Sequence, residues 1–207
     1  MDKTERLQGV ISARNVGEVT DLYDAWAEAY EQDMSASGYR LPAVACGYFG
    51  RHVQPGSSVL DAGAGTGIMG EALSVLGYSP LIGIDVSNSM LDVARRKGIY
   101  AELRQMTLGE PLDYGDDAFD AAVSLGVLIP GHAPPHALDE LVRVVKPGGH
   151  LVFNVGAQAY QEGGFKEKQD ALERAGKWRL LTMTEPLRSL PLGLSEFQSR
   201  MFVYQAQ

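Results

Sequence analysis

A short apolar segment that runs directly into a glycine-rich turn is the feature that most constrains this fold. Residues 59–67 read Val-Leu-Asp-Ala-Gly-Ala-Gly-Thr-Gly, and an amphipathic segment, 68–76, follows at once. Glycines allow a tight turn and the close approach of a ligand to the backbone, and the start of the next helix presents free N–H groups. The segment therefore predicts a strand, a ligand-binding turn and a helix.

Short apolar runs alternate with amphipathic segments along most of the chain. We expect strands at 58–62, 80–86, 99–105, 119–125, 150–155, 178–184 and 200–205, and helices at 68–76, 90–97, 135–146 and 165–175. Such alternation predicts an α/β protein with a parallel sheet and helices on both faces, and right-handed crossovers make that sheet doubly wound. Ligands of such sheets bind outside the carboxyl ends of the strands.

The part of the chain that precedes this core predicts an arm and helices. Residues 1–16 are expected to form a loosely held arm. A helix is predicted where apolar side chains recur at helical spacing, at Val19, Tyr23, Trp26 and Tyr30, and a second helix is expected after Pro42. At 207 residues we expect a single domain, made of an N-terminal arm and lid helices (1–54) and a doubly wound core (55–207).

Charge and cysteine content exclude several classes of protein. The chain has 18 Lys and Arg against 26 Asp and Glu, and this net charge of −8 argues against a dedicated nucleic-acid binder and against docking on an anionic membrane. The single cysteine, Cys46, excludes an internal disulfide and a cysteine-based zinc site, and no histidine cluster indicates another metal site. We see no secretory signal and no run of about 18 apolar residues, and we expect a cytoplasmic protein, monomeric or homodimeric.

Two carboxylates mark the carboxyl ends of the first two predicted strands. Asp61 would repel a pyrophosphate group but suits a ligand with a positively charged amino group. Asp85 ends the second strand, where a carboxylate can accept hydrogen bonds from both hydroxyls of a ribose. The alternative role of Asp85 is an N-cap of the next helix, which Ser87 or Ser89 could serve equally well.

The glycine turn also permits a different interpretation. Gly65, Gly67 and Gly70 form a literal G-x-G-x-x-G, the pattern of NAD-binding turns, which expects an acidic residue about 20 positions on. In that register the strand would have to end about two residues late, and Asp61 would lie beside the pyrophosphate. We therefore favour another ligand and keep an NAD(P)-dependent oxidoreductase as the alternative.

Four motifs in order resemble those of class I S-adenosylmethionine (SAM)-dependent methyltransferases. They lie at 61–67, 83–91, 119–124 and 143–149. The resemblance as a whole covers roughly residues 16–155. It implies a Rossmann-like sheet of seven strands in the order 3-2-1-4-5-7-6 with the last strand antiparallel, SAM as cofactor and S-adenosyl-L-homocysteine as product. A looser likeness, at 23–30, 107–109 and 171–178, is to the Williams–Beuren syndrome region methyltransferase-like group.

The resemblance also implies contacts to each part of SAM. For the methionine part these are the backbone of Gly63, Ala64, Gly65 and Gly67, with Asp61 at the amino group and Ser124 and Leu125 beneath. For the nucleoside part they are Asp85 at the ribose, Val86 on the adenine, and Met106, Thr107 and Leu108 at the adenine edge. The family often has Asp where this chain has Thr107, which departs from its pattern. The lid helix would bring Tyr23 and Tyr30 near the sulfonium, because an aromatic face attracts a cation.

Methyl transfer requires a protein to align the acceptor and to exclude water, and it needs a base only when the acceptor holds its proton tightly. His132, in the loop after the fourth strand, is the candidate base, and an exposed loop histidine is the alternative. Trp26 and Tyr160 are candidate substrate contacts, with core packing the alternative for Trp26. Residues 146–149 are expected at the opposite end of the sheet, and residues 185–197 form an insertion that could be a lid, a dimer contact or a surface hairpin.

The acidic balance and the absence of an added recognition domain favour a small-molecule acceptor for the methyl group. Two other functions fit the same residues. One is a SAM-binding sensor or partner module without activity, and the other is a protein or peptide methyltransferase.

Overall fold

The computed structural model describes residues 2–129, 131–194 and 196–207. Met1, Pro130 and Ser195 lie outside the described residues; they fall in the predicted arm, in the loop after the fourth strand and in the predicted insertion.

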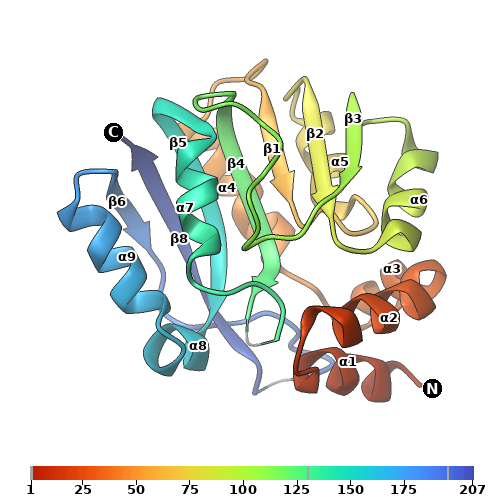
Figure 1. Cartoon of the computed structure of the whole chain (residues 1–207). Helices are drawn as coiled ribbons and strands as arrows, with labels where there is room; N and C mark the ends of the chain where they lie inside the picture. The colour runs from red at the N-terminus through yellow and green to blue at the C-terminus, as the bar shows by residue number, and fades with distance from the viewer. Residues whose placement is uncertain (1, 130, 195) are drawn as a thin grey trace.

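A doubly wound sheet forms the centre of the molecule (Figure 1). Its strands are β1 (Val59–Ala62), β2 (Leu81–Asp85), β3 (Glu102–Gln105), β4 (Phe119–Leu128), β5 (Val145–Gly156), β6 (Trp178–Met183), β7 (Leu187–Arg188) and β8 (Gln198–Ala206). The order is β3-β2-β1-β4-β5-β8-β6, with β1 to β5 parallel and β8 antiparallel to both neighbours. This confirms the predicted order, since β8 and β6 stand where the seventh and sixth strands were expected.

Two layers of helices cover the sheet. The helices of the core are α4 (Leu41–His52), α5 (Ile68–Val75), α6 (Asn88–Lys97), α7 (Ala137–Arg143), α8 (Ala157–Glu162) and α9 (Phe165–Arg174). Side chains alternate along β1, so Val59 packs with α4 and α5, whereas Leu60 packs with α7 and α9 on the other face. Asp61 therefore belongs to the α4 and α5 face of the sheet.

Local sequence signals set the bounds of α6. The hydroxyl of Ser87 accepts a hydrogen bond from the N–H of Met90 at 3.1 Å, which makes Ser87 the N-cap, and Gly98 ends the helix in the left-handed conformation. Arg95, Arg96 and Lys97 occupy the last turn, where positive charge is favourable. The helix ends at Lys97 as the sequence predicts, and it begins at Asn88, two residues before the predicted start.

Residues 1–16 do not form the expected loose arm within the part that the structure describes. Residues Lys3–Ser12 form a helix, α1, which begins with a capping box between Asp2 and Glu5 and buries Leu7 and Val10. The prediction was wrong because it followed the charge of this segment and overlooked its Asp-x-x-Glu signal.

The predicted aromatic helix is also interrupted. It consists of α2 (Val16–Trp26), a 3-10 turn (Ala27–Ala29) and α3 (Tyr30–Ala36). Helices α1 to α3, which we call the lid, lie beyond the carboxyl ends of β1, β2 and β4 (Figure 1). Tyr23, Trp26 and Tyr30 still contact one another across the break, with ring centroids 4.9 to 6.2 Å apart.

Three further segments differ from the prediction. Residues 157–162 of the expected loop after the fifth strand form α8, and two residues of the insertion form β7, which pairs with β8 and adds an eighth strand. Residues 146–149 are part of β5, although the predicted strand begins only at 150. They have no partner in β4, because the pairing passes from Phe119 opposite Val145 to Ala121 opposite His150. Within the described residues, none of the helices has the length and apolarity needed to cross a membrane.

Candidate functional site

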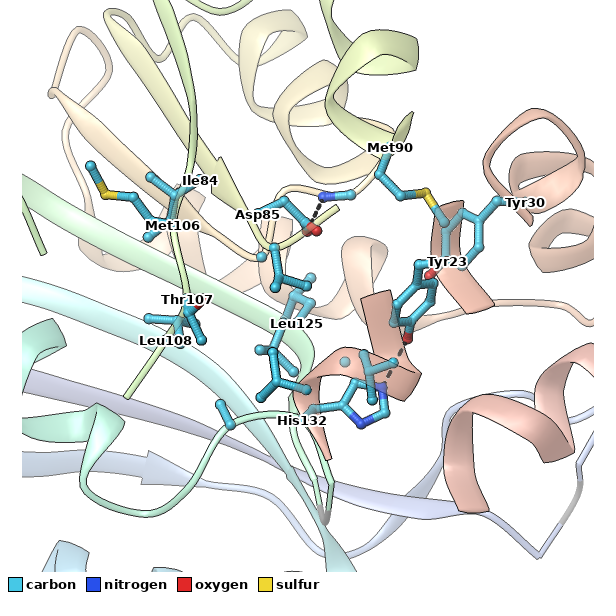
Figure 2. A pocket seen from close by; sticks show the side chains of 18 residues that line it. Tyr23, Tyr30, Ile84, Asp85, Met90, Met106, Thr107, Leu108, Leu125 and His132 are labelled. Atoms are coloured by element: carbon cyan, nitrogen blue, oxygen red, sulfur yellow. Dashed lines mark hydrogen bonds between the residues drawn. The ribbon is translucent and has the colours of Figure 1, made fainter. Parts of the chain in front are cut away.

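A cavity of about 670 Å³ opens at the carboxyl ends of the parallel strands, between the core and the lid (Figure 2). We call it the first cavity. It is lined by Val16, Val19, Tyr23, Tyr30, Gly63, Gly65, Ile84, Asp85, Val86, Met90, Met106, Thr107, Leu108, Leu125, Gly126, Val127, His132 and Ala133. In the sheet β1 lies between β2 and β4, and the strand order changes direction between β1 and β4. The cavity lies at this switch point, where such sheets bind ligands.

The carboxylate of Asp85 is fixed by the backbone on both sides. Its Oδ2 accepts a hydrogen bond from the N–H of Gly65 at 2.8 Å, and its Oδ1 accepts one from the N–H of Ser87 at 2.9 Å. Burial nevertheless raises the pKa of Asp85 above its usual value, because the hydrogen bonds only partly offset the loss of solvent. Asp85 thus joins the glycine turn to β2 and presents fixed acceptor oxygens to the first cavity.

Asp61 lies in a second cavity of about 350 Å³, and its exposed fraction is 2%. The hydroxyl of Tyr100 donates a hydrogen bond to its Oδ2 at 2.6 Å. Burial raises the pKa of Asp61 to about 7 in spite of this bond. No Lys, Arg or His side chain among the described residues forms an ion pair with Asp61, so the site has an uncompensated buried carboxyl group.

The glycine turn connects these two cavities. Gly63 and Gly65 line both, and each has a positive φ. A side chain at Gly63 would also collide with Val127, because a Cβ there would lie 2.1 Å from its Cγ2. The turn therefore requires glycine for its backbone conformation and for its packing against β4.

Much of the wall of the first cavity is apolar. Four residues that the sequence analysis assigns to the nucleoside part of the ligand, Val86, Met106, Thr107 and Leu108, line this cavity. Met90 of α6 also lines it and adds a thioether that the sequence analysis missed. Met106 and Leu108, on either side of Thr107 in the sequence, are apolar side chains of the kind that suits a flat aromatic base.

The lid closes the first cavity with two tyrosines. Tyr23 and Tyr30 line it, and Figure 2 shows the Tyr23 hydroxyl directed at His132. The Tyr23 oxygen and Nε2 of His132 are 3.2 Å apart, within hydrogen-bond distance. Burial raises the pKa of Tyr23 well above its usual value, so Tyr23 is a neutral phenol at neutral pH. The pair connects the lid to the loop after β4.

Several predicted site residues lie away from the first cavity. Ala64 lines the second cavity, and Gly67 is the N-cap of α5. Ser124 is buried, and its hydroxyl donates to the carbonyl oxygen of Ala62 at 2.8 Å. Neither Gly67 nor Ser124 lines any of the described cavities.

The two predicted substrate residues differ in position. Trp26 is buried, its Nε1–H donates to Asp33 at 2.8 Å, and it lines a third cavity described below. Tyr160 lies on α8 beside Phe202, with ring centroids 5.1 Å apart, and lines none of the three cavities described here. Their roles remain predictions.

Tyr39 and Tyr100 are site residues that the sequence analysis missed. Tyr39 follows α3 and lines the second cavity, and Tyr100 precedes β3. Neither lies in a motif, and each reaches the site through folding that brings distant segments together. Among the described residues no group of three or more His, Cys, Asp or Glu is arranged to hold a metal ion.

The fold and this site are those of an α/β protein with a ligand-sized cavity at the switch point of a Rossmann-like sheet. Comparison with known proteins makes the class specific. Residues 60–153 match the model of a family described as "Methyltransferase domain". The matched model and the curated relatives support membership of the class I SAM-dependent methyltransferase superfamily, whose cofactor is SAM.

Two curated relatives and one solved structure illustrate the likeness. The chain is 37% identical over 165 residues to human Methyltransferase-like protein 27 (76% of this chain, 66% of the relative). It is 36% identical over 103 residues to a ubiquinone biosynthesis O-methyltransferase of Alkalilimnicola ehrlichii (48% and 41%). A SAM-dependent methyltransferase of Thermotoga maritima, described as a possible histamine N-methyltransferase, aligns with a TM-score of 0.63 at 19% identity, covering 89% of this chain and 98% of that one.

The chain spans less than two thirds of the length of these curated relatives. Family membership favours SAM over the NAD(P) alternative. The narrower likeness to the Williams–Beuren syndrome region group stays a prediction.

Proposed function

We propose that this protein binds SAM and transfers its methyl group to a small-molecule acceptor. The observation that carries the proposal is the pair of carboxylates, one buried and one partly buried, in two neighbouring cavities. Asp85 lies at the nucleoside end, Asp61 lies in the second cavity, and the glycine turn forms a wall of both. Such a site suits one ligand that combines a ribose with a cationic amino group.

The residues present fit SAM on electrostatic grounds. A buried carboxyl group with a pKa of about 7 and no cationic partner among the described side chains favours a ligand that brings a positive charge. The amino group of SAM supplies that charge near Asp61. The backbone-fixed oxygens of Asp85 are suited to accept hydrogen bonds from the ribose hydroxyls.

When bound, SAM supplies a methyl group activated by its sulfonium. The chain must then align an acceptor, keep water out and, for a hydroxyl acceptor, receive a proton. Tyr23 and Tyr30 cover the cavity and present aromatic rings, which attract a cation. In our proposal Tyr23 takes the proton of the acceptor at its oxygen as it passes its own to Nε2 of His132, so His132 is the final base.

The small-molecule acceptor is supported by two observations. A net charge of −8 opposes nucleic-acid substrates, and one matched relative is named as acting in ubiquinone biosynthesis, on a small molecule. A protein or peptide acceptor and a non-catalytic SAM sensor remain the alternatives.

Asp85→Ala tests the cofactor site. We expect the variant to fold and to lose binding of S-adenosyl-L-homocysteine, measured by calorimetry, because the ribose loses its acceptor. Asp120→Ala is the matched control, since Asp120 also accepts a backbone N–H, from Ser58 at 2.8 Å, but at the other end of the sheet. Unchanged affinity in Asp85→Ala would refute the site assignment.

Methyl-labelled SAM tests the activity. Incubated with the protein and a cell extract, it should label the small-molecule fraction, and Asp85→Ala should abolish this label. Label in the protein fraction would instead support a protein methyltransferase. Binding of SAM without label anywhere would support a sensor.

A further inference from the structure

A third cavity, of about 470 Å³, lies between the lid, the end of β4 and the segment before β8. It is lined by Leu7, Val10, Ile11, Tyr23, Trp26, Tyr30, Met34, Tyr39, Leu41, Gly126, Ile129, Ser189, Leu190 and Phe197. Nothing derived so far uses this cavity, although α1, α2 and α3 all contribute to its walls.

The three cavities meet at one side chain. Tyr30 lines all three, Tyr23 lines the first and third, and Tyr39 lines the second and third. The backbone at the end of β4 continues the junction, because Leu125 lines the first and second cavities and Gly126 lines the first and third. A ligand that fills the first two cavities therefore has the third cavity as its neighbour at Tyr30.

The chemistry of a sulfonium matches this three-way junction. Its sulfur carries three groups, which in SAM are the adenosyl part, the amino acid part and the methyl group. We infer that the third cavity is the acceptor chamber, and that it takes a neutral, mostly apolar molecule with a nucleophilic hydroxyl at the Tyr30 end. This inference rests on the proposed function and names the substrate class of the same site.

The composition of the walls sets this substrate class. No Lys, Arg, His, Asp or Glu lines the third cavity among the described residues. Two of its polar groups are already engaged: Trp26 Nε1–H donates to Asp33 at 2.8 Å, and the Ser189 hydroxyl donates to that of Ser199 at 3.0 Å. Burial of a charged acceptor there without a partner is unfavourable, whereas burial of apolar area is favourable.

The remaining polar groups lie at the junction. They belong to the side chains of Tyr23, Tyr30 and Tyr39, which the cavity shares with the cofactor side. The Tyr23 hydroxyl is also within hydrogen-bond distance of Nε2 of His132, at 3.2 Å. An acceptor hydroxyl can therefore find hydrogen-bond partners at one end of the chamber and apolar walls at the other. This arrangement orients the nucleophile toward the cofactor cavities.

The step balances within the site. A bond forms between the acceptor oxygen and the methyl carbon, and the carbon–sulfur bond breaks with its electron pair left on sulfur. The hydroxyl proton passes to the oxygen of Tyr23 as the proton of Tyr23 passes to Nε2 of His132, 3.2 Å away. No further oxidant or reductant is needed.

The two tryptophans of the chain provide a direct binding assay. Trp26 lines the third cavity, whereas Trp178 lies on β6, stacks on Tyr204 and lines none of the three cavities. In a spectrum of the indole N–H groups we expect titration with 2-naphthol to shift the signal of Trp26 and to leave that of Trp178 in place. Trp178→Phe assigns the two signals. The charged analogue 6-hydroxynaphthalene-2-sulfonate should bind at least about tenfold more weakly.

Matched variants locate the probe. Ile11→Phe fills the third cavity from a partly exposed position and should weaken 2-naphthol binding at least about tenfold, with binding of S-adenosyl-L-homocysteine unchanged. Thr107→Phe fills the first cavity. It should weaken binding of S-adenosyl-L-homocysteine and leave binding of 2-naphthol unchanged. Leu190→Phe is a second variant that fills the third cavity, in case Ile11→Phe disturbs α1. Bound S-adenosyl-L-homocysteine reports that these two variants are folded, and bound 2-naphthol reports that Thr107→Phe is folded.

The outcomes separate this inference from the proposed function. If S-adenosyl-L-homocysteine binds but 2-naphthol leaves the Trp26 signal unmoved, the inference is wrong and the cofactor site stands. The same conclusion follows if both filling variants bind 2-naphthol normally, or if the sulfonate binds equally well. If S-adenosyl-L-homocysteine itself does not bind the wild-type protein, the proposed function fails, and the inference fails with it.

Discussion

Asp61 is the residue at which stability and binding oppose each other. The carboxyl group is buried, and its pKa of about 7 compares with a usual value of 3.8. In the unfolded chain Asp61 ionises from about pH 4 upward, whereas in the folded protein it stays neutral until about pH 7. The folded state therefore loses stability as pH rises from about 4 to about 7, and this loss is complete above pH 7.

Asp61→Asn should make the protein without ligand more stable at pH 8, while at pH 4 the two proteins should be alike. The reason is that the amide cannot ionise and can still accept the hydrogen bond of Tyr100. The pKa difference sets a ceiling of about 4 kcal/mol on this gain. Urea unfolding at several pH values measures it. Asp120→Asn is the control of opposite sign, because hydrogen bonds from Lys146 and Ser58 lower the pKa of Asp120.

The same carboxyl group should make cofactor binding pH-dependent. A cationic amino group beside Asp61 favours its ionised form, so its pKa should fall on binding and a proton should be released. We expect the affinity for S-adenosyl-L-homocysteine to rise with pH by at most about tenfold per pH unit until about pH 7. Above that pH the affinity should level off. Calorimetry at pH 6.5 in buffers of different ionisation enthalpy counts the proton. Wild-type binding without proton release would contradict this role of Asp61.

The residue scale also shows what sequence could and could not provide. Asp61, Asp85 and the glycines were found because a strand followed by a turn places them at one end of the sheet. Tyr100 was not found from the sequence, because it is 39 positions away from Asp61 and their contact follows from no local pattern. The structure also gives Gly70 a role other than NAD binding: a Cβ there would lie 2.1 Å from the Tyr100 hydroxyl oxygen.

Among the elements, the three lid helices share one carboxylate as well as an apolar cluster. Oδ2 of Asp33 in α3 accepts hydrogen bonds from Nη1 of Arg6 in α1 and from Nε1 of Trp26 in α2, both at 2.8 Å. The three helices are short, and such helices are marginal without tertiary contacts. Asp33 thus connects α3 to both α1 and α2 by hydrogen bonds, and these tertiary contacts stabilise helices that would be marginal alone.

Asp33→Ala should destabilise the lid and weaken cofactor binding. It leaves the buried N–H of Trp26 and the guanidinium of Arg6 without this acceptor, which costs about 1–3 kcal/mol. Thermal unfolding and the affinity for S-adenosyl-L-homocysteine check it. Asp92→Ala is the control, because the ion pair of Asp92 with Arg95 is exposed on α6 and its loss should change stability by no more than about 0.5 kcal/mol. Equal effects of the two variants would refute the role of Asp33.

Apart from α1, whose local capping signal was overlooked, elements were predicted well where their own sequence defines them and poorly where neighbouring elements do. The strands and α6 carry apolar runs and caps that act locally. The break between α2 and α3 carries no proline or capping side chain, and its tight turn accompanies packing of Trp26 against Tyr30, with ring centroids 4.9 Å apart. Helix α8 and strand β7 are short, so their apolar patterns are too brief to distinguish them from loops.

At the scale of the whole molecule, the cavities join two parts that are distant in sequence. Tyr23 and Tyr30 come from the lid, whereas Gly65, Asp85 and Leu125 come from the sheet, and all five line the first cavity. A ligand in this cavity contacts both parts at once. Its binding energy therefore depends on the lid being closed, and by linkage the ligand must favour the closed lid.

Hydrogen exchange with bound S-adenosyl-L-homocysteine tests this linkage. At a ligand concentration of about 100 times Kd, opening of the site should cost about 2.7 kcal/mol more than in the free protein. We expect slower exchange in α1 to α3 and in the turn at 63–67, where the ligand holds lid and core together. Helix α9 is the internal control, because none of its residues lines the three cavities and amides that exchange there by local opening should keep their rates. Protection confined to the turn at 63–67 would show that the ligand binds the core alone, and that the lid closes without any contribution from the cofactor.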